Sequence, residues 1–120
     1  MSSLLDTLKA TVGSFRKSDI TDEQIRQHHY LLAKEDVVES MFNYAILCLS
    51  DCGGQKNLGH SEYWLNLAAN KGSVDAQYFL GMLYVEGDYF ELDKSKGMYW
   101  LSISAANGDD RAQCYFENDI

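Results

Sequence analysis

Apolar side chains recur three and four residues apart along most of the chain, which is the spacing of one face of an α-helix. The stripe of the clearest stretch, 74–87, consists of Ala76, Phe79, Leu80, Leu83 and Tyr84. The preceding stretch carries a shorter stripe at Trp64, Leu67 and Ala68. The sequence has no proline, the residue that most strongly breaks helices. We therefore expect an all-α protein.

Glycines and polar residues mark where these helices should end and begin. Left-handed helix stops are expected at Gly72, Gly87 and Gly108. Ser73 and Asp109 follow two of these stops and are candidate N-caps of the next helix. Gly81 lies in mid-helix, where glycine costs about 1 kcal/mol relative to alanine. We expect a neighbouring helix to come very close at that position.

The sequence repeats itself with a period of 36 residues, without a gap. In the stretch 63–77, the residues that recur unchanged after one period are Tyr63, Trp64, Leu65, Ala69, Gly72, Ala76 and Gln77. A weaker copy extends back to about Asp36, with Ala45 at the position of Gly81. A period of this length is the mark of a solenoid, in which each unit buries its apolar face against the next.

The residues that carry this period resemble the Sel1-like repeat, a relative of the tetratricopeptide repeat. The matching positions are Ala76, Leu80, Gly81, Tyr84, Gly87, Asp93, Lys96, Gly97, Trp100, Ala105, Ala106 and Gly108. Gly97 stands where the family usually has alanine, and should loosen that helix start. Trp64, Gly72 and Ala112 belong to the same repeat framework. The resemblance implies a short right-handed α-solenoid of antiparallel helix pairs, with about two to two and a half repeats.

The expected organisation is an N-terminal helical cap at 1–35, repeats at about 36–71 and 72–107, and a partial repeat at 108–120. One capping helix is expected at roughly 3–16, from the spacing of its apolar residues. A second, at about 22–34, would begin at a capping box formed by Thr21 and Gln24. Beyond the second repeat, Cys114, Tyr115 and Phe116 either pack back on Trp100 or offer an apolar edge, through which a homodimer could form.

Charge narrows the range of partners. The net charge is −8, and residues 35–120 hold fourteen acidic and five basic side chains. Such a surface disfavours nucleic acid and anionic membranes, which need clustered Lys and Arg. It suits plain solubility or a partner with a basic surface. The spaced leucines of the N-terminus do not form a signal peptide, and three unpaired cysteines fit a reducing compartment, so we expect a cytoplasmic protein.

Candidate chemistry is sparse. His28 and His29 are adjacent and diverge on a helix, His60 falls in an expected linker, and no zinc spacing is present. Cys48 and Cys52 are four residues apart, which allows a two-thiol metal or redox site but favours two buried structural cysteines. A Cys52 nucleophile assisted by His60 is an open alternative with little support. We expect no cofactor, no metal and no enzymatic activity.

The loop after Gly87 is the expected partner-binding site. Tyr89 and Phe90 fall outside the helix stripes and should be exposed anchors within an acidic rim. The acidic members of the predicted site are Glu86, Asp88, Glu91, Asp93, Asp109 and Asp110. Trp64 and Trp100, by contrast, are expected in the repeat core.

Size, charge and resemblance together predict a protein that binds another protein. The favoured hypothesis is a small acidic immunity protein that binds and neutralises a basic partner such as a toxin. The alternative is a general adaptor in a signalling or secretion assembly. Binding that depends on electrostatic steering would favour the immunity protein. Salt-insensitive binding in an apolar groove would favour the adaptor.

Overall fold

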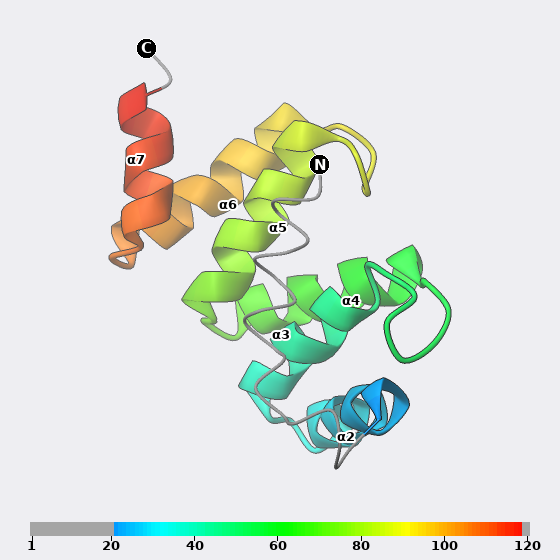
Figure 1. Cartoon of the computed structure of the whole chain (residues 1–120). Coiled ribbons are helices and arrows are strands. Elements are labelled where there is room, and N and C mark those ends of the chain that lie inside the picture. The colour runs from blue at the N-terminus through cyan, green and yellow to red at the C-terminus, as the bar shows by residue number, and fades with distance from the viewer. Residues whose placement is uncertain (1–20, 119–120) are drawn as a thin grey trace. The chain divides into compact units, whose positions relative to one another are not determined.

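The computed structural model describes residues 21–118, and this part of the chain contains six α-helices and no strand (Figure 1). The helices are α2 (Asp22–Lys34), α3 (Val38–Leu47), α4 (Leu58–Asn70), α5 (Val74–Glu86), α6 (Lys94–Ala106) and α7 (Asp110–Asn118). The expected all-α fold is confirmed, whereas the helix expected at 3–16 lies outside the described residues. Contacts divide the chain into an N-terminal unit, Met1–Trp64, and a C-terminal unit, Leu65–Ile120.

In the N-terminal unit, α2 packs on α3. The expected capping box is present, because Gln24 N donates to Thr21 Oγ1 (3.2 Å) and Thr21 N donates to Gln24 Oε1 (2.9 Å). The chain from Ser40 to Ser50 is buried throughout. This segment, which includes almost all of α3, is therefore the core of the unit.

Arg26 of α2 holds the loop that joins α3 to α4. Its guanidinium donates to the carbonyl oxygens of Gln55 (2.7 Å), Cys52 (3.1 Å) and Leu47 (3.5 Å). The approach depends on Gly53, whose left-handed φ of 74° suits glycine and whose added Cβ would collide with the Asp22 carbonyl of α2. A planar guanidinium with five donors can satisfy several loop carbonyls at once.

In the C-terminal unit, α5 and α6 lie side by side and touch through two glycines (Figure 1). A Cβ on Gly81 would lie 2.8 Å from Leu101 Cγ and 2.9 Å from the Gly97 carbonyl oxygen. A Cβ on Gly97 would lie 2.7 Å from the Gly81 carbonyl oxygen and collide with Val85. The close approach expected at Gly81 is confirmed. Gly97 was expected only to loosen the start of its helix, but it also allows α6 to pack closely against α5.

The 36-residue period is also visible in local geometry. The helices α2, α4 and α6 each have 13 residues, and equivalent residues differ by 36 in number. Each starts after a side-chain cap, at Thr21, Asn57 and Asp93. The same backbone bond closes each of them, namely Val37 N to Leu32 O, Ser73 N to Ala68 O and Asp109 N to Ser104 O. The helix α2 therefore has the geometry of a repeat's second helix, which the sequence did not predict.

Each of these turns also contains one residue with a left-handed backbone. The residues are Asp36 (φ 71°), Gly72 (φ 99°) and Gly108 (φ 95°). The stops expected at Gly72 and Gly108 are confirmed, and Gly87 (φ 71°) caps α5 in the same conformation. Asp36 adopts at the end of α2 a conformation that glycine provides in the later turns, because aspartate tolerates it better than most residues.

The helix α7 is fastened to α5 by Arg111. This side chain donates to Asp109 (2.6 Å to Oδ2) and to Asp75 of α5 (2.7 Å to Oδ1), and it lies over the Tyr78 ring at 4.4 Å. Asp109 also accepts from the Ala112 N–H (3.3 Å), which makes it the expected N-terminal cap. The helix is thus fixed by charge-assisted hydrogen bonds and a cation–π contact.

Candidate functional site

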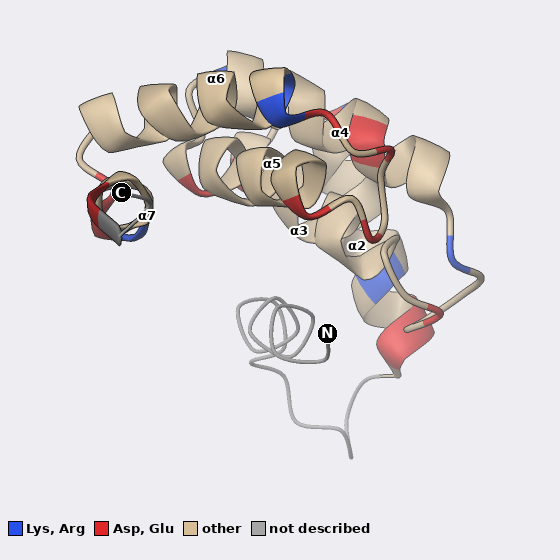
Figure 2. Ribbon diagram, turned by 90° about the horizontal axis from the view of Figure 1, so that it is seen from above, with Lys and Arg blue, Asp and Glu red and all other residues tan. Residues whose placement is uncertain are grey.

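The predicted site after Gly87 is only partly available to a partner. Figure 2 shows acidic positions in the loop joining α5 to α6 and basic positions at the start of α6. Glu86, Asp88 and Glu91 are exposed, and Asp93 is half-buried because it caps α6 through Lys96 N (3.1 Å). Burial and, after it, the Asp88 charge raise the pKa of the Glu86 carboxyl. The loop therefore presents a small acidic rim.

The expected exposure of Phe90 is wrong. Its side chain is 6% exposed and packs on Tyr84, with 5.6 Å between ring centroids. Gly87 turns the chain back at the end of α5, and the bond from Asp93 N to Tyr84 O (2.9 Å) closes the loop over that ring. The exposed apolar side chain of the loop is Leu92 at 58%, while Tyr89 is half-buried.

Asp109 is not a surface acid either, whereas Asp110 is exposed. The residue is 7% exposed, and its carboxylate is occupied by Arg111 and by the start of α7. Burial alone would raise the Asp109 pKa, but hydrogen bonds from Arg111 and Ala112 outweigh it and hold the pKa below its ordinary value. Asp109 therefore caps the first turn of α7.

Aromatic side chains gather in the N-terminal unit, where sequence reasoning expected no site. The aromatic cluster consists of Tyr30 of α2, Tyr44 of α3 and Tyr63 and Trp64 of α4. Trp64 stands nearly perpendicular to Tyr30 (86°, centroids 6.5 Å apart) and to Tyr44 (87°, 6.3 Å). Edge-to-face geometry of this kind is the favoured arrangement of aromatic pairs.

The cluster runs from the core to the surface. Tyr44 is 7% exposed and hydrogen-bonds His60 Nδ1 (3.0 Å), Tyr30 and Trp64 are half-buried, and Tyr63 is 60% exposed. The core position expected for Trp100 is confirmed at 8% exposure, but Trp64 remains partly open to solvent. Tyr30 was the residue in the sequence that could have indicated this cluster. It is not repeated one period later, where Asn66 stands, so the repeat pattern did not mark it.

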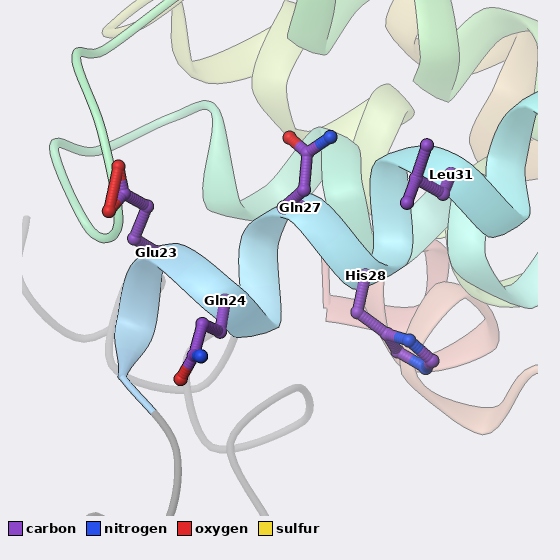
Figure 3. A pocket seen from close by; sticks show the side chains of 5 residues that line it. All are labelled: Glu23, Gln24, Gln27, His28 and Leu31. Carbon is purple, nitrogen blue, oxygen red and sulfur yellow. The ribbon is translucent and has the colours of Figure 1, made fainter.

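A hollow lies along α2 (Figure 3). Among the described residues it is lined by Glu23, Gln24, Gln27, His28 and Leu31. Gln27 and Leu31 point to one side of the helix and Gln24 and His28 to another. All five belong to one helix, and they do not form a nucleophile–base pair of the kind that catalysis needs.

The cysteines and histidines of residues 21–118 lie at different places in the fold. Cys48 is buried, with Arg26 Nη2 at 3.6 Å from its sulfur, and burial raises the pKa of its thiol. Cys52 is half-buried and Cys114 exposed. His60 belongs to α4, so its expected place in a linker is wrong. Its Nδ1 faces Tyr44 at 3.0 Å.

Residues 21–118 contain no group of three or more His, Cys, Asp or Glu side chains placed to hold a metal ion. In the same part of the chain, every helix is too short or too polar to cross a membrane.

The family model for the Sel1 repeat matches residues 38–73 and 74–109. The chain belongs to the Sel1 repeat family. The two matched Sel1 repeats begin with α3 and α5, and the Gly81–Gly97 contact lies inside the second. No curated protein matches the sequence.

Two solved structures share this fold. The crystal structure of a Sel1 repeat protein from Oxalobacter formigenes is 22% identical, with a TM-score of 0.71 over 91% of this chain and 43% of that one. The crystal structure of c5321, a protective antigen of uropathogenic Escherichia coli strains displaying an SLR fold, is 21% identical, with a TM-score of 0.74 over 91% of this chain and 22% of that one. The chain thus spans less than half of either protein, and the likeness concerns the fold.

Proposed function

We propose that this Sel1 repeat protein acts without catalysis, by binding another protein that carries a basic surface. The observation that carries the proposal is the repeat fold itself, because Sel1 repeats form a protein-interaction fold. A solenoid of this size offers enough surface for one standard interface of about 800 Å² on each side.

Charge supports the choice of a basic partner. The net charge is −8, and the exposed acids include Glu86, Asp88, Glu91 and Asp110. A field of one sign raises the association rate of a cationic protein and falls with ionic strength. These exposed acids are the residues we assign to steering. The finer proposal is a cytoplasmic inhibitor or immunity protein that neutralises a basic toxin.

Affinity capture from native lysate of the source organism tests the proposal. The tagged full chain is used at low salt and at about 0.5 M salt, where the Debye length falls to a few ångströms. One stoichiometric basic protein that is lost at high salt is the expected result. The double variant Asp88→Lys with Glu91→Lys should capture less of this protein. The control is Ser95→Lys with Ser102→Lys, at two other exposed positions, and it should reduce the captured amount less because no acid is lost.

A general adaptor is the second candidate. The observation in its favour is exposed apolar surface, for example Leu92 at 58% and Leu31 at 52%. Several partners, or one that survives high salt, would favour the adaptor over the inhibitor. Retention of no protein at either salt would contradict both.

A further inference from the structure

Cations already lie on the rings of the aromatic cluster. Lys34 Nζ is 5.3 Å from the centre of the Tyr30 ring, and Arg26 Cζ is 6.0 Å from that of Tyr44. An aromatic face attracts a cation within about 6 Å, and arginine does this more often than lysine. Arg26 is committed to the loop carbonyls, but Lys34 is exposed and sits at the surface end of the cluster.

The charge around the cluster favours a cation from another molecule. Residues 21–64 hold seven acidic and three basic side chains, and Glu23 lies on the same face of α2 as Tyr30, two turns away. A cation that displaced Lys34 from Tyr30 would therefore enter a negative field. The half-buried Tyr30 and Trp64 and the exposed Tyr63 leave ring surface open to it.

The arrangement occurs in only one of the two matched repeats. Tyr99 and Trp100 repeat the pair Tyr63 and Trp64, with ring centroids 5.1 Å apart and Tyr99 59% exposed. The two tyrosines that stand against Trp64, however, are replaced one period later by Asn66 and Leu80. The second pair therefore has the exposed tyrosine without the aromatic walls.

We propose that Tyr30, Tyr63 and Trp64 form a docking surface for an arginine side chain of a basic protein partner. This inference rests on the proposed function and names a contact surface for it. Arginine fits better than lysine because its planar guanidinium stacks on ring faces and is more weakly hydrated. Buried or half-buried aromatic anchors of this kind dominate the energy of many interfaces.

The test is titration of the full chain with a hexa-arginine peptide, and with hexa-lysine for comparison, by calorimetry at low salt. We expect hexa-arginine to bind more tightly than hexa-lysine. The variant Tyr63→Ala should weaken hexa-arginine binding about two- to fivefold, the worth of one exposed cation–π contact. Its matched control, Tyr99→Ala, removes an equally exposed tyrosine and should leave the affinity unchanged.

A second readout uses the fluorescence of Trp64 in a Trp100→Phe background. Hexa-arginine should change this emission, and in a Tyr30→Leu variant the change should require more peptide. Equal effects of Tyr63→Ala and Tyr99→Ala, or no effect of either, would overturn the docking surface. So would a concentration-dependent dimer abolished by Tyr63→Ala, which would make a second copy the occupant.

The two proposals fail separately. Stoichiometric capture of a basic partner that is unaffected by Tyr63→Ala would leave the proposed function standing and overturn the arginine surface. Absence of any basic partner, together with hexa-arginine binding that is weakened in Tyr63→Ala but not in Tyr99→Ala, would overturn the proposed function alone.

Discussion

Asp75 and Arg111 hold the same position in successive repeats, 36 residues apart, and their side chains meet, with 2.7 Å between Asp75 Oδ1 and Arg111 Nη2. Both are about half exposed, so this ion pair is worth at most about 1 kcal/mol. The other partner of Arg111 is different, because the Asp109 side chain is only 4% exposed. The start of α7 is therefore stabilised mainly by the Asp109 contact, whereas Arg111 attaches the helix to α5 through the Tyr78 ring and, more weakly, through Asp75.

The variant Arg111→Ala should destabilise α7 by about 1–3 kcal/mol, because it leaves a buried carboxylate without its charged donor. Hydrogen exchange of the α7 amides measures this as faster local opening. The control, Asp75→Asn, removes only the exposed partner and should have a much smaller effect. Equal acceleration in both variants would contradict the importance of Asp109.

The same pair predicts a dependence on pH. The folded-state pKa of Asp109 lies below its ordinary value of 3.8, so its contribution is fully present above pH 3.8 and is lost as the pH falls through the folded-state pKa. The difference in α7 exchange between wild type and Arg111→Ala should therefore narrow under strongly acidic conditions. A difference that persists when the carboxyl is protonated would assign it to the Tyr78 contact.

His29 is a buried imidazole at a position that is leucine in the later repeats. It is 8% exposed, whereas the equivalent Leu65 and Leu101 are fully buried. Its Nδ1 faces Ser40 Oγ (3.3 Å), and its Nε2 has no hydrogen-bond partner among the described residues. Burial, and secondly the neighbouring His28, lower the pKa of His29.

Because the unfolded chain takes up this proton at a higher pH than the folded chain, stability should fall as the pH drops below about 6.5. The variant His29→Leu removes this loss. Its advantage in urea unfolding should grow between pH 7 and pH 5, by at most about 1.4 kcal/mol per pH unit. The exposed neighbour provides the control, since His28→Gln should keep most of the pH dependence. An unchanged pH dependence in His29→Leu would place its origin elsewhere.

Alanine at Gly81 or at Gly97 should destabilise the C-terminal unit by about 1–3 kcal/mol, because each Cβ would press on backbone of the opposite helix. This cost exceeds the gain in helix propensity of about 1 kcal/mol. Urea unfolding measures the difference. Gly59 is the matched control, because its Cβ would meet only Asn57 Oδ1 at 3.6 Å. Gly59→Ala should be neutral or stabilising, and a loss similar to that of Gly81→Ala would refute the steric explanation.

Removing the Arg26 guanidinium should free the loop between α3 and α4. In Arg26→Gln, cleavage after the exposed Lys56 by a lysine-specific protease should accelerate about tenfold, which corresponds to the loss of charged hydrogen bonds worth about 1.4 kcal/mol. Cleavage after Lys94, in the C-terminal unit, serves as the control in the same digest. Equal acceleration at both sites would indicate general unfolding instead of loop release.

The sequence predicted those features that depend on local spacing and on the period. The helix stops at Gly72 and Gly108, the Thr21 capping box and the close approach at Gly81 all follow from residues a few positions apart, or from comparing one repeat with the next. The family assignment rested on the same comparison, and the Sel1 model confirms it.

Features that depend on distant residues were missed. Arg26 reaches carbonyls 21 to 29 residues away, and nothing in its own surroundings indicates a loop anchor. Phe90 looked exposed because its acidic neighbours are, yet the chain turns back at Gly87 and buries its ring. The aromatic cluster was missed because it combines Tyr30, outside the recognised repeats, with Trp64, inside one. The partner predicted for the acidic loop stays a prediction.

The turn that ends α2 is built like the turns that end α4 and α6, with one bond spanning five residues and one left-handed residue in each. The three turns therefore share one backbone geometry. A second copy of residues 73–108 inserted after Gly72 would keep the native junction of Gly72 with Ser73 at its start. At its end Ser73 would follow Gly108, which again joins a left-handed glycine to an N-cap residue. Chain growth in this protein can therefore proceed by whole-unit duplication, and the number of units is not fixed by the chemistry of any single turn.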